Sequence, residues 1–134
     1  MNQSKAITLI TGANKGLGDE TALQLIERGH IVYVGAHDIA RGQEAADKLG
    51  AKFVPLDVTD DASIEAAIGV IDEREGRLDV LVNNAGMSTS TAEVDGQLAL
   101  KVFDTNAIGV IHVTQAALPL LQRFQNHASE RTAV

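Results

Sequence analysis

Four short apolar runs constrain the fold of this chain more than any other feature of its sequence. They cover residues 7–10, 31–34, 53–56 and 80–82, and each is rich in valine or isoleucine. Runs that do not alternate between apolar and polar residues are typical of strands buried on both faces. A stretch with a helical pattern follows each run, so the sequence predicts an α/β fold. Its core would be a mostly parallel sheet with right-handed crossover connections.

The helices are predicted from the spacing of apolar residues. The clearest one lies between the third and fourth runs, where the spacing is i, i+3, i+4 and i+7. These positions are Ile64, Ala67, Ile68 and Ile71. Thr59 is the expected N-cap of this helix, with Asp60 and Asp61 in its first turn. Two further helices, after the first and second runs, are expected to end at Gly29 and Gly50, because glycine commonly terminates a helix.

The order of the strands is predicted from Pro55, which lies inside the third run. Proline has no N–H to donate to a neighbouring strand, so this strand is expected at a sheet edge, as in a doubly wound order 3-2-1-4. Residues 98–124 are expected to form a helix that Pro119 bends or interrupts. Residues 126–132 are polar and predict a loop. The last two residues resemble the start of a fifth strand.

Composition limits the classes of function. The chain has 134 residues, a formal net charge of −7 and 45% hydrophobic residues, which is typical of one globular domain. An acidic balance without a basic stripe argues against nucleic acid as a partner. No apolar run approaches the roughly 20 residues of a membrane span, and no signal peptide is recognised. Since there is no cysteine, neither disulfides nor thiolate metal sites are expected, and the expected location is the cytoplasm.

A glycine-rich segment joins the first predicted strand to the first helix. Residues 11–18 are Thr-Gly-Ala-Asn-Lys-Gly-Leu-Gly. Gly12 and Gly16 would let the backbone turn tightly and approach a pyrophosphate, and Gly18 would let helix and strand pack closely. The N–H groups of the helix N-terminus would face the anion. An ordinary glycine-rich loop is the alternative, and the position at the first strand-to-helix turn favours the phosphate cradle.

Four motifs together resemble the short-chain dehydrogenase/reductase family. They are the glycine loop, Leu56-Asp57-Val58, Asn83-Asn84-Ala85-Gly86 and Thr105-Asn106-Ala107-Ile108-Gly109. The resemblance covers essentially the whole chain, and the Asn-Lys pair in the loop is most similar to the carbonyl-reductase branch. It implies one NAD(P)-binding, Rossmann-like domain over residues 1–134. This domain is expected to be incomplete at its C-terminus, truncated before the fifth strand.

The resemblance also implies roles for individual residues. Asn106 is the implied active-site asparagine. The implied cofactor-binding residues come from the glycine loop and from the ends of the next three strands: Gly12, Asn14, Lys15, Gly16, Leu17, Gly18, His37, Asp57, Val58, Asn83, Ala85 and Gly86. The loop would hold the pyrophosphate, Asp57 and Val58 would flank the adenine, and the Asn83 segment would line the ribose and nicotinamide side. As alternatives, Asn83 could cap a turn and Asp57 could cap a helix.

Asn106 also stands out by its spacing. Val102, Val110 and Val113 lie at i−4, i+4 and i+7 from it. This pattern predicts that the Asn106 amide points at the apolar face of its helix, where it needs a hydrogen-bond partner. A satisfied core asparagine is the alternative interpretation.

Charge after the second strand favours NADP(H) over NAD(H). In an NAD enzyme an acidic residue about 20 positions beyond the glycine loop accepts the ribose 2′-hydroxyl, and it would repel a 2′-phosphate. Ala36 stands at that position, His37 stands where relatives carry arginine, and Lys15 adds a positive charge from the loop. Asp38 weighs against this preference. Lys15 and His37 could also be plain surface residues.

The serine, tyrosine and lysine that handle the substrate and its proton in this family are not found. Tyr33, the only tyrosine, lies inside the second run. The favoured interpretation is the cofactor-binding part of an NADP(H)-dependent oxidoreductase for a small carbonyl/alcohol pair, inactive as 134 residues alone. The alternatives are a regulator that binds a dinucleotide without turnover and an interaction module. Substrate, reaction direction and oligomeric state stay open, although the long last helix resembles the one through which relatives form homo-oligomers.

Overall fold

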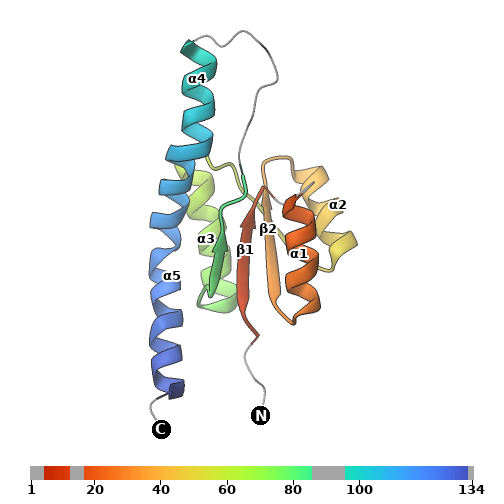
Figure 1. Cartoon of the computed structure of the whole chain (residues 1–134), viewed down its shortest axis with the longest axis vertical. Coiled ribbons are helices and arrows are strands. Elements are labelled where there is room, and N and C mark those ends of the chain that lie inside the picture. The colour runs from red at the N-terminus through yellow and green to blue at the C-terminus, as the bar shows by residue number, and fades with distance from the viewer. Residues whose placement is uncertain (1–4, 13–16, 86–95, 133–134) are drawn as a thin grey trace.

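A parallel sheet forms the centre of the structure, a computed structural model that describes residues 5–12, 17–85 and 96–132. Its four strands have the order β3-β2-β1-β4 (Figure 1). The strands are β1 (Ile7–Thr11), β2 (Ile31–Ala36), β3 (Lys52–Pro55) and β4 (Val80–Val82). All three neighbouring pairs are parallel. The predicted fold class and strand order are confirmed.

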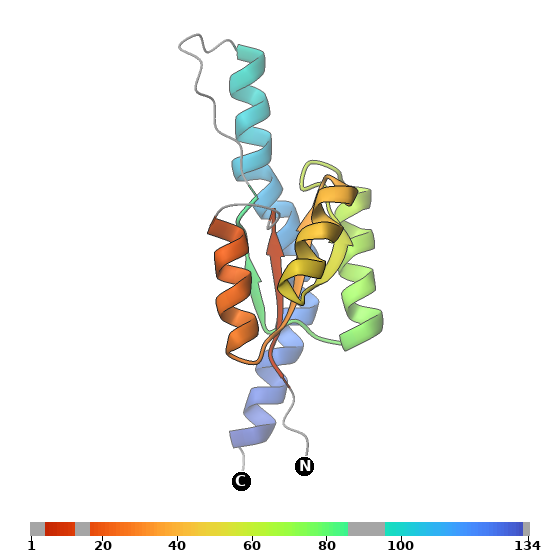
Figure 2. The same cartoon turned by 90° about the vertical axis from the view of Figure 1, so that its right-hand side faces the viewer.

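Helices cover both faces of this sheet. They are α1 (Leu17–Glu27), α2 (Ile39–Leu49), α3 (Asp61–Glu75), α4 (Gly96–Phe103) and α5 (Gly109–Thr132), with a π-helical turn at Asp104–Ile108. Figure 2 shows the sheet edge-on, with α1 on one side and α3 on the other. The core is accordingly in two parts. Leu9 and Tyr33 pack against α3 and α5, whereas Ile10 and Val34 pack against α1 and α2.

Pro55 ends β3 at the edge of the sheet, as its missing N–H predicts. It lies opposite Ala36 of β2 in register. The next residue, Leu56, donates its backbone N–H to the Ala36 carbonyl at 3.0 Å. Gly35 leaves room for the Leu56 side chain, because a Cβ on Gly35 would lie 2.7 Å from Leu56 Cδ2. The segment that follows β3 is therefore held against the end of β2.

The start of α3 differs from the prediction. Asp60 is the N-cap, and its carboxylate accepts hydrogen bonds from the backbone N–H groups of Ala62 and Ser63 at 3.0 and 3.4 Å. The prediction that Thr59 caps this helix is wrong. The Thr59 hydroxyl donates to Asp57 at 2.6 Å instead. A carboxylate is a stronger acceptor for helix N–H groups than a hydroxyl, so the neighbouring aspartate takes the cap position.

Helix α5 continues through Pro119 to its end. The predicted interruption and the predicted loop at residues 126–132 are therefore wrong. Proline removes one backbone hydrogen bond, which a helix of 24 residues tolerates here. The polar segment after it includes good helix formers, and no glycine or further proline follows to end the helix. Within the described ranges no helix, α5 included, is long and apolar enough to cross a membrane.

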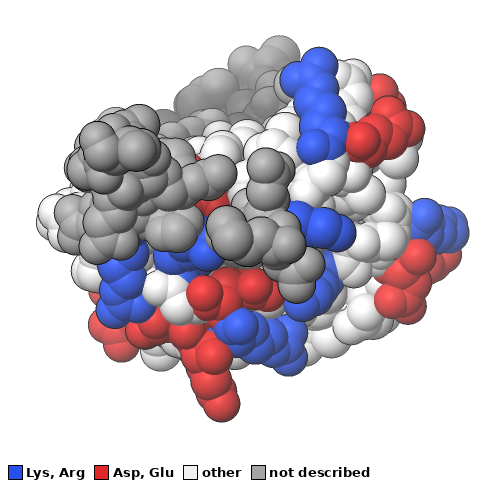
Figure 3. Space-filling model, turned by 90° about the horizontal axis from the view of Figure 1, so that it is seen from below, with Lys and Arg blue, Asp and Glu red and all other residues white. Residues whose placement is uncertain are grey.

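Polar contacts close the amino edge of the sheet, where the strands begin. Arg123 of α5 donates to the Gly76 carbonyl, at the end of α3, at 2.9 Å. Asp79 accepts the backbone N–H of Ile7 at 2.6 Å and pairs with Arg77 at 3.0 Å. Figure 3 views the molecule from this end and shows acidic and basic side chains next to one another. The functional candidates lie at the opposite, carboxyl edge.

Candidate functional site

Two backbone segments meet at the carboxyl ends of the neighbouring strands β1 and β4. Thr11 ends β1, and its hydroxyl oxygen accepts hydrogen bonds from the backbone N–H groups of Asn84 and Ala85 at 3.1 and 3.0 Å. The Asn84 side-chain amide donates to the Gly12 carbonyl at 3.2 Å. Since Thr11 is only 1% exposed, these bonds are shielded from water. They hold the segment after β4 against the start of the glycine loop.

Gly12 lies where these two segments come closest. Its φ of 66° is in the left-handed region, and its N–H donates to the Gly35 carbonyl at 2.6 Å. A Cβ on Gly12 would lie 2.7 Å from Ala85 Cα, closer than real Cβ atoms approach. Both the backbone conformation and the contact therefore require glycine. This edge, outside the carboxyl ends of parallel strands, is where open α/β sheets bind ligands.

The remaining glycine-loop residues are described only in part. Leu17 and Gly18 form the first turn of α1, and Gly18 is buried there. Asn14, Lys15 and Gly16 lie outside the described residues, as does Gly86. The roles assigned to these four residues stay predictions.

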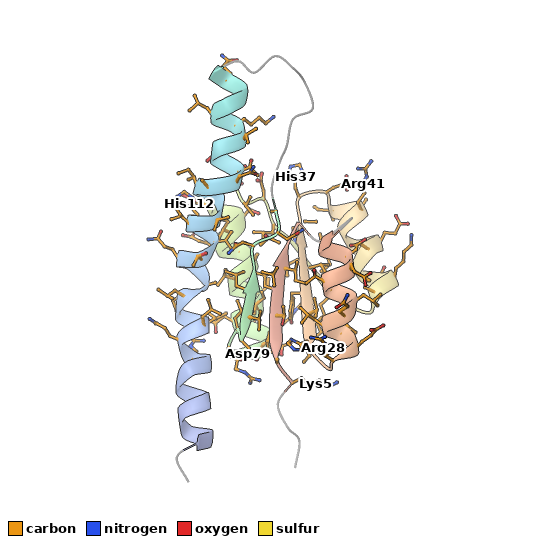
Figure 4. The ribbon with its side chains drawn as sticks, in the orientation of Figure 1. Lys5, Arg28, His37, Arg41, Asp79 and His112 are labelled. Atoms are coloured by element: carbon orange, nitrogen blue, oxygen red, sulfur yellow. The ribbon has the colours of Figure 1, made fainter. Side chains whose placement is uncertain are left out.

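A second group of predicted residues lies at the ends of β2 and β3. His37 directly follows β2 and is exposed at the carboxyl edge (Figure 4). Asp57 follows β3, and its Oδ1 accepts the hydroxyl and the backbone N–H of Thr59 at 2.6 and 2.9 Å. The Thr59 hydroxyl holds the pKa of Asp57 below its ordinary value against the opposing effect of burial, and the charge of His37 adds to the lowering. Asp57 is thus a fixed negative charge near His37.

The acidic residue next to His37 serves a local purpose. Asp38 is the N-cap of α2, and its carboxylate accepts the Arg41 backbone N–H at 3.0 Å. Arg41 Nε lies 3.8 Å from the other carboxylate oxygen. Both side chains belong to the exposed start of α2, and Figure 4 shows Arg41 at the same edge as His37. The charge of Asp38 is therefore engaged within its own helix.

The start of α5 rests on the ends of β3 and β4. Val58 is buried, and a Cβ on Gly109, the first residue of α5, would lie 3.0 Å from the Val58 carbonyl oxygen. The Asn83 side-chain amide donates to the Thr114 hydroxyl at 3.4 Å. Asn83 therefore links the end of β4 to α5, which places two predicted site segments, around Val58 and Asn83, against one helix.

Asn106 lies in the π-helical turn that precedes α5. Its spacing predicted an amide that points at the apolar face, and this is wrong, because Asn106 is exposed whereas Val113 is buried. A π turn has i→i+5 hydrogen bonds, so the i+4 positions on either side no longer share a face with Asn106. Single π turns of this kind are frequent at functional sites.

Tyr33 is committed to a different contact. It is fully buried in β2, and its hydroxyl donates to Glu75, the last residue of α3, at 2.9 Å. Lys52 Nζ lies 3.3 Å from the same carboxylate oxygen. Burial and, after it, the hydrogen bond and charge of Glu75 raise the pKa of Tyr33 to about 12. This phenol holds its proton inside the fold and is not available as an acid at the carboxyl edge.

Thr11 and Asn84 help to build this edge, although no sequence motif predicted a structural role for either side chain. One signal was present, because Thr11 ends a strand buried along its whole length, where a hydroxyl needs an internal partner. The partner itself could not be predicted from spacing, since it lies 73 residues away. In the part of the chain that the structure describes, no group of three or more His, Cys, Asp or Glu side chains could hold a metal ion.

Known proteins match this chain over most of its length. The sequence model of the short chain dehydrogenase family matches residues 6–129. A 3-ketodihydrosphingosine reductase from Bacteroides thetaiotaomicron is 35% identical over an alignment of 121 positions that covers 87% of this chain and 42% of that protein. The chain spans about half the length of the curated relatives it matches.

Solved structures share the fold. An actinorhodin polyketide ketoreductase, solved with NADPH, gives a TM-score of 0.82 at 34% identity over 91% of this chain and 49% of that one. An NADH-dependent reductase solved with NAD gives a TM-score of 0.81 at 28% identity over 94% of this chain and 56% of that one. The sheet and helices around the candidate site are therefore arranged as in proteins of both cofactor types.

Proposed function

Because the chain belongs to the short-chain dehydrogenase family, we propose that it forms the dinucleotide-binding part of an oxidoreductase that acts on a small carbonyl/alcohol pair. The observation that carries this proposal is the meeting of two backbone segments at the carboxyl ends of β1 and β4. Buried Thr11 fixes residues 84 and 85 against Gly12, so closely that a Cβ on Gly12 would lie 2.7 Å from Ala85 Cα. A position at this turn that only glycine can take is expected where a pyrophosphate comes close to the backbone.

The residues present fit a nicotinamide dinucleotide. The N-terminal turn of α1 would hold the pyrophosphate through backbone N–H groups, and Gly12, whose own N–H donates to the Gly35 carbonyl, would let the pyrophosphate come close to the backbone. Val58, which is buried, and the fixed carboxylate of Asp57 would flank the adenine. Asn83 and Ala85 would line the ribose and nicotinamide side, where Asn83 is already oriented by Thr114.

The chemistry divides between the cofactor and the chain. A nicotinamide cofactor supplies or accepts the hydride when it is bound. We assign Asn106, in its exposed π turn, to the reacting end of the site. Tyr33 does not donate a proton there, because it is buried and bonded to Glu75. A dinucleotide-binding regulator without turnover is therefore a second candidate function for these 134 residues.

The residues after β2 support a preference for NADP(H). Ala36 has no carboxylate to accept a 2′-hydroxyl, and exposed His37 offers a group that can bind a 2′-phosphate. Asp38, which weighed against this preference, is engaged by Arg41 and the start of α2. Since the solved relatives include complexes with NADPH and with NAD, the preference rests on these residues and on Lys15.

Isothermal titration with NADPH and NADH tests the proposal. We expect both dinucleotides to bind, NADPH more tightly, and Lys15→Glu to weaken NADPH selectively, because charge-assisted hydrogen bonds to the 2′-phosphate are worth roughly 1.5–3 kcal/mol. Lys48→Glu is the matched control, since Lys48 pairs with Glu44 on α2. No binding of either dinucleotide would refute the function and favour an interaction module. Equal affinities would refute the cofactor preference alone.

The proposal includes a cytoplasmic location and self-association through α5. Ile111 and Leu118, seven positions apart on this helix, are 53% and 46% exposed. An apolar pair at this spacing lies on one helical face, which water would disfavour in a monomer. Light scattering of the chain and of an Ile111→Gln/Leu118→Gln variant tests self-association. A monomeric mass for the unmodified chain would refute it.

A further inference from the structure

The two carboxylate oxygens of Asp57 have different surroundings. Oδ1 accepts the Thr59 hydroxyl at 2.6 Å and the Thr59 backbone N–H at 2.9 Å. Both bonds end on the same oxygen, and within the described ranges no hydrogen bond ends on Oδ2. Because a carboxylate is planar, two donors that hold Oδ1 also fix the direction in which Oδ2 can accept a hydrogen bond.

The backbone that carries this carboxylate is fixed as well. The Asp57 N–H donates to Ser63 Oγ on α3 at 2.9 Å, and the Leu56 N–H donates to the Ala36 carbonyl at 3.0 Å. The hydrogen bond from the Thr59 hydroxyl is also the main cause that lowers the pKa of Asp57, so the carboxylate stays ionised and only accepts. Oδ2 is therefore a single acceptor held in place beside the end of β2.

We propose that Thr59 is a positioning residue, which determines the atom that residue 57 presents to the purine base of a bound dinucleotide. This inference rests on the proposed function, in which Asp57 flanks the adenine. Thr59 donates twice and so holds the acceptor atom of residue 57, which leaves the atom at the Oδ2 position for the base. A carboxylate oxygen there accepts from the 6-amino group of adenine and repels the 6-oxygen of hypoxanthine.

Titration with NADH and with its hypoxanthine analogue tests this inference, since the two dinucleotides differ only in the base. We expect the unmodified chain to bind NADH about tenfold more tightly, because the analogue replaces a hydrogen bond to a charged group with a contact between two acceptors. Asp57→Asn should invert this ratio. Thr59 would hold the amide oxygen, so that the amide NH₂ group donates to the 6-oxygen of hypoxanthine.

Variants of Thr59 separate positioning from the mere presence of Asp57. Thr59→Val removes the hydroxyl that holds Oδ1, so the preference for NADH should fall to about threefold or less, and Thr59→Ser should restore it. The double variant Asp57→Asn/Thr59→Val should prefer neither base, because its amide is free to turn over. If Thr59→Val does not fold, the inversion expected in Asp57→Asn decides the question.

Asp60→Asn is the matched control. Asp60 has the same charge three residues further along, and its carboxylate accepts the N–H groups of Ala62 and Ser63 as the N-cap of α3. Asparagine caps helices about as well as aspartate. This variant should therefore keep the ratio of the unmodified chain. An inverted ratio in Asp60→Asn would show that loss of a negative charge is enough, and it would overturn the inference.

The remaining outcomes distinguish the inference from the proposed function. An NADH preference that Thr59→Val leaves unchanged would show that Thr59 only shapes the turn, and it overturns the inference. Equal binding of the two dinucleotides by the unmodified chain, or an Asp57→Asn variant that still prefers NADH, overturns it too. In each of these cases NADH binds, so the proposed function stands. If the chain is folded by circular dichroism and binds neither dinucleotide, both are refuted.

Discussion

Replacing Gly12 with alanine tests the closest contact of the candidate site. The expected loss of stability has two parts. Alanine at a φ of 66° costs roughly 1–2 kcal/mol, because the left-handed conformation crowds its Cβ. The new Cβ would also lie 2.7 Å from Ala85 Cα, a backbone atom held by the hydrogen bonds to Thr11. Overpacking of this kind costs roughly 1–3 kcal/mol. We therefore expect Gly12→Ala to lower the free energy of unfolding by about 2–5 kcal/mol.

Gly50→Ala separates the two parts. Gly50 is the C-cap of α2 with a φ of 77°, and nothing lies within 4 Å of a Cβ built there. This variant should lose only the conformational part, about 1–2 kcal/mol. Urea unfolding followed by far-UV circular dichroism measures both losses, since the chain has no tryptophan. Dinucleotide titration of the folded variants should show binding by Gly50→Ala and none by Gly12→Ala.

The losses of stability in the two variants must differ if Ala85 packs against Gly12. Equal losses for Gly12→Ala and Gly50→Ala would show that Ala85 does not press against Gly12. The same result would remove the observation on which the proposed function rests. A larger loss of stability for Gly50→Ala would show that replacing the C-cap glycine of α2 costs more than overpacking the contact between Gly12 and Ala85.

Three further predictions concern Thr11, Tyr33 and the activity of the chain. Thr11→Val leaves the buried N–H groups of Asn84 and Ala85 without an acceptor and should cost about 2–4 kcal/mol in urea unfolding, whereas Thr11→Ser should restore most of it; a cost under about 0.5 kcal/mol would contradict this. The pKa of Tyr33 in the folded chain is about 12, against an ordinary value of 10. Its contribution to the free energy of unfolding, on the order of 2 kcal/mol, is therefore complete below pH 10 and is lost towards pH 12. The stability advantage of the unmodified chain over Tyr33→Phe should therefore shrink between pH 8 and pH 12, and a constant difference would refute the assignment. We also predict that the 134-residue chain does not oxidise NADPH with aldehydes or ketones above background, because Tyr33 is buried and bonded to Glu75 and a positioned acid is worth roughly 10²–10⁴ in rate; turnover that Asn106→Ala abolishes would show that another acid operates.

The sheet could be predicted because its signals are local properties of residues. Two-sided burial produces continuous apolar runs, and the missing N–H of Pro55 restricts β3 to an edge. The glycine loop follows from the same logic, since Gly12 has the positive φ that its position demands. These features do not depend on contacts with residues far away in the sequence, so the sequence alone predicts them.

The errors have several different causes. Thr59 and Asp60 both can cap α3, and their acceptor strength decides which one does. Asn106 was expected on a buried face, because a regular α-helix was assumed where a π turn forms. Residues 126–132 were interpreted by polarity, although their helix-forming side chains and the length of α5 carry the helix through them. The hydrogen bond between the Asn84 backbone N–H and the Thr11 hydroxyl could not be predicted, since no local pattern encodes a partner 73 residues away.

The separation of 73 residues between Thr11 and Asn84 also affects when the site forms during folding. β1 can pair with β2 as soon as the first helix connects them, because Ile7 lies opposite Ile31. Its pairing with β4 must wait for a much longer loop to close, and loop closure of this kind slows folding. Thr11 and Gly12 leave the ribosome well before residues 84 and 85, which pack against them in the folded chain. The proposed dinucleotide would meet its site only in the finished sheet and would then stabilise the folded chain by mass action.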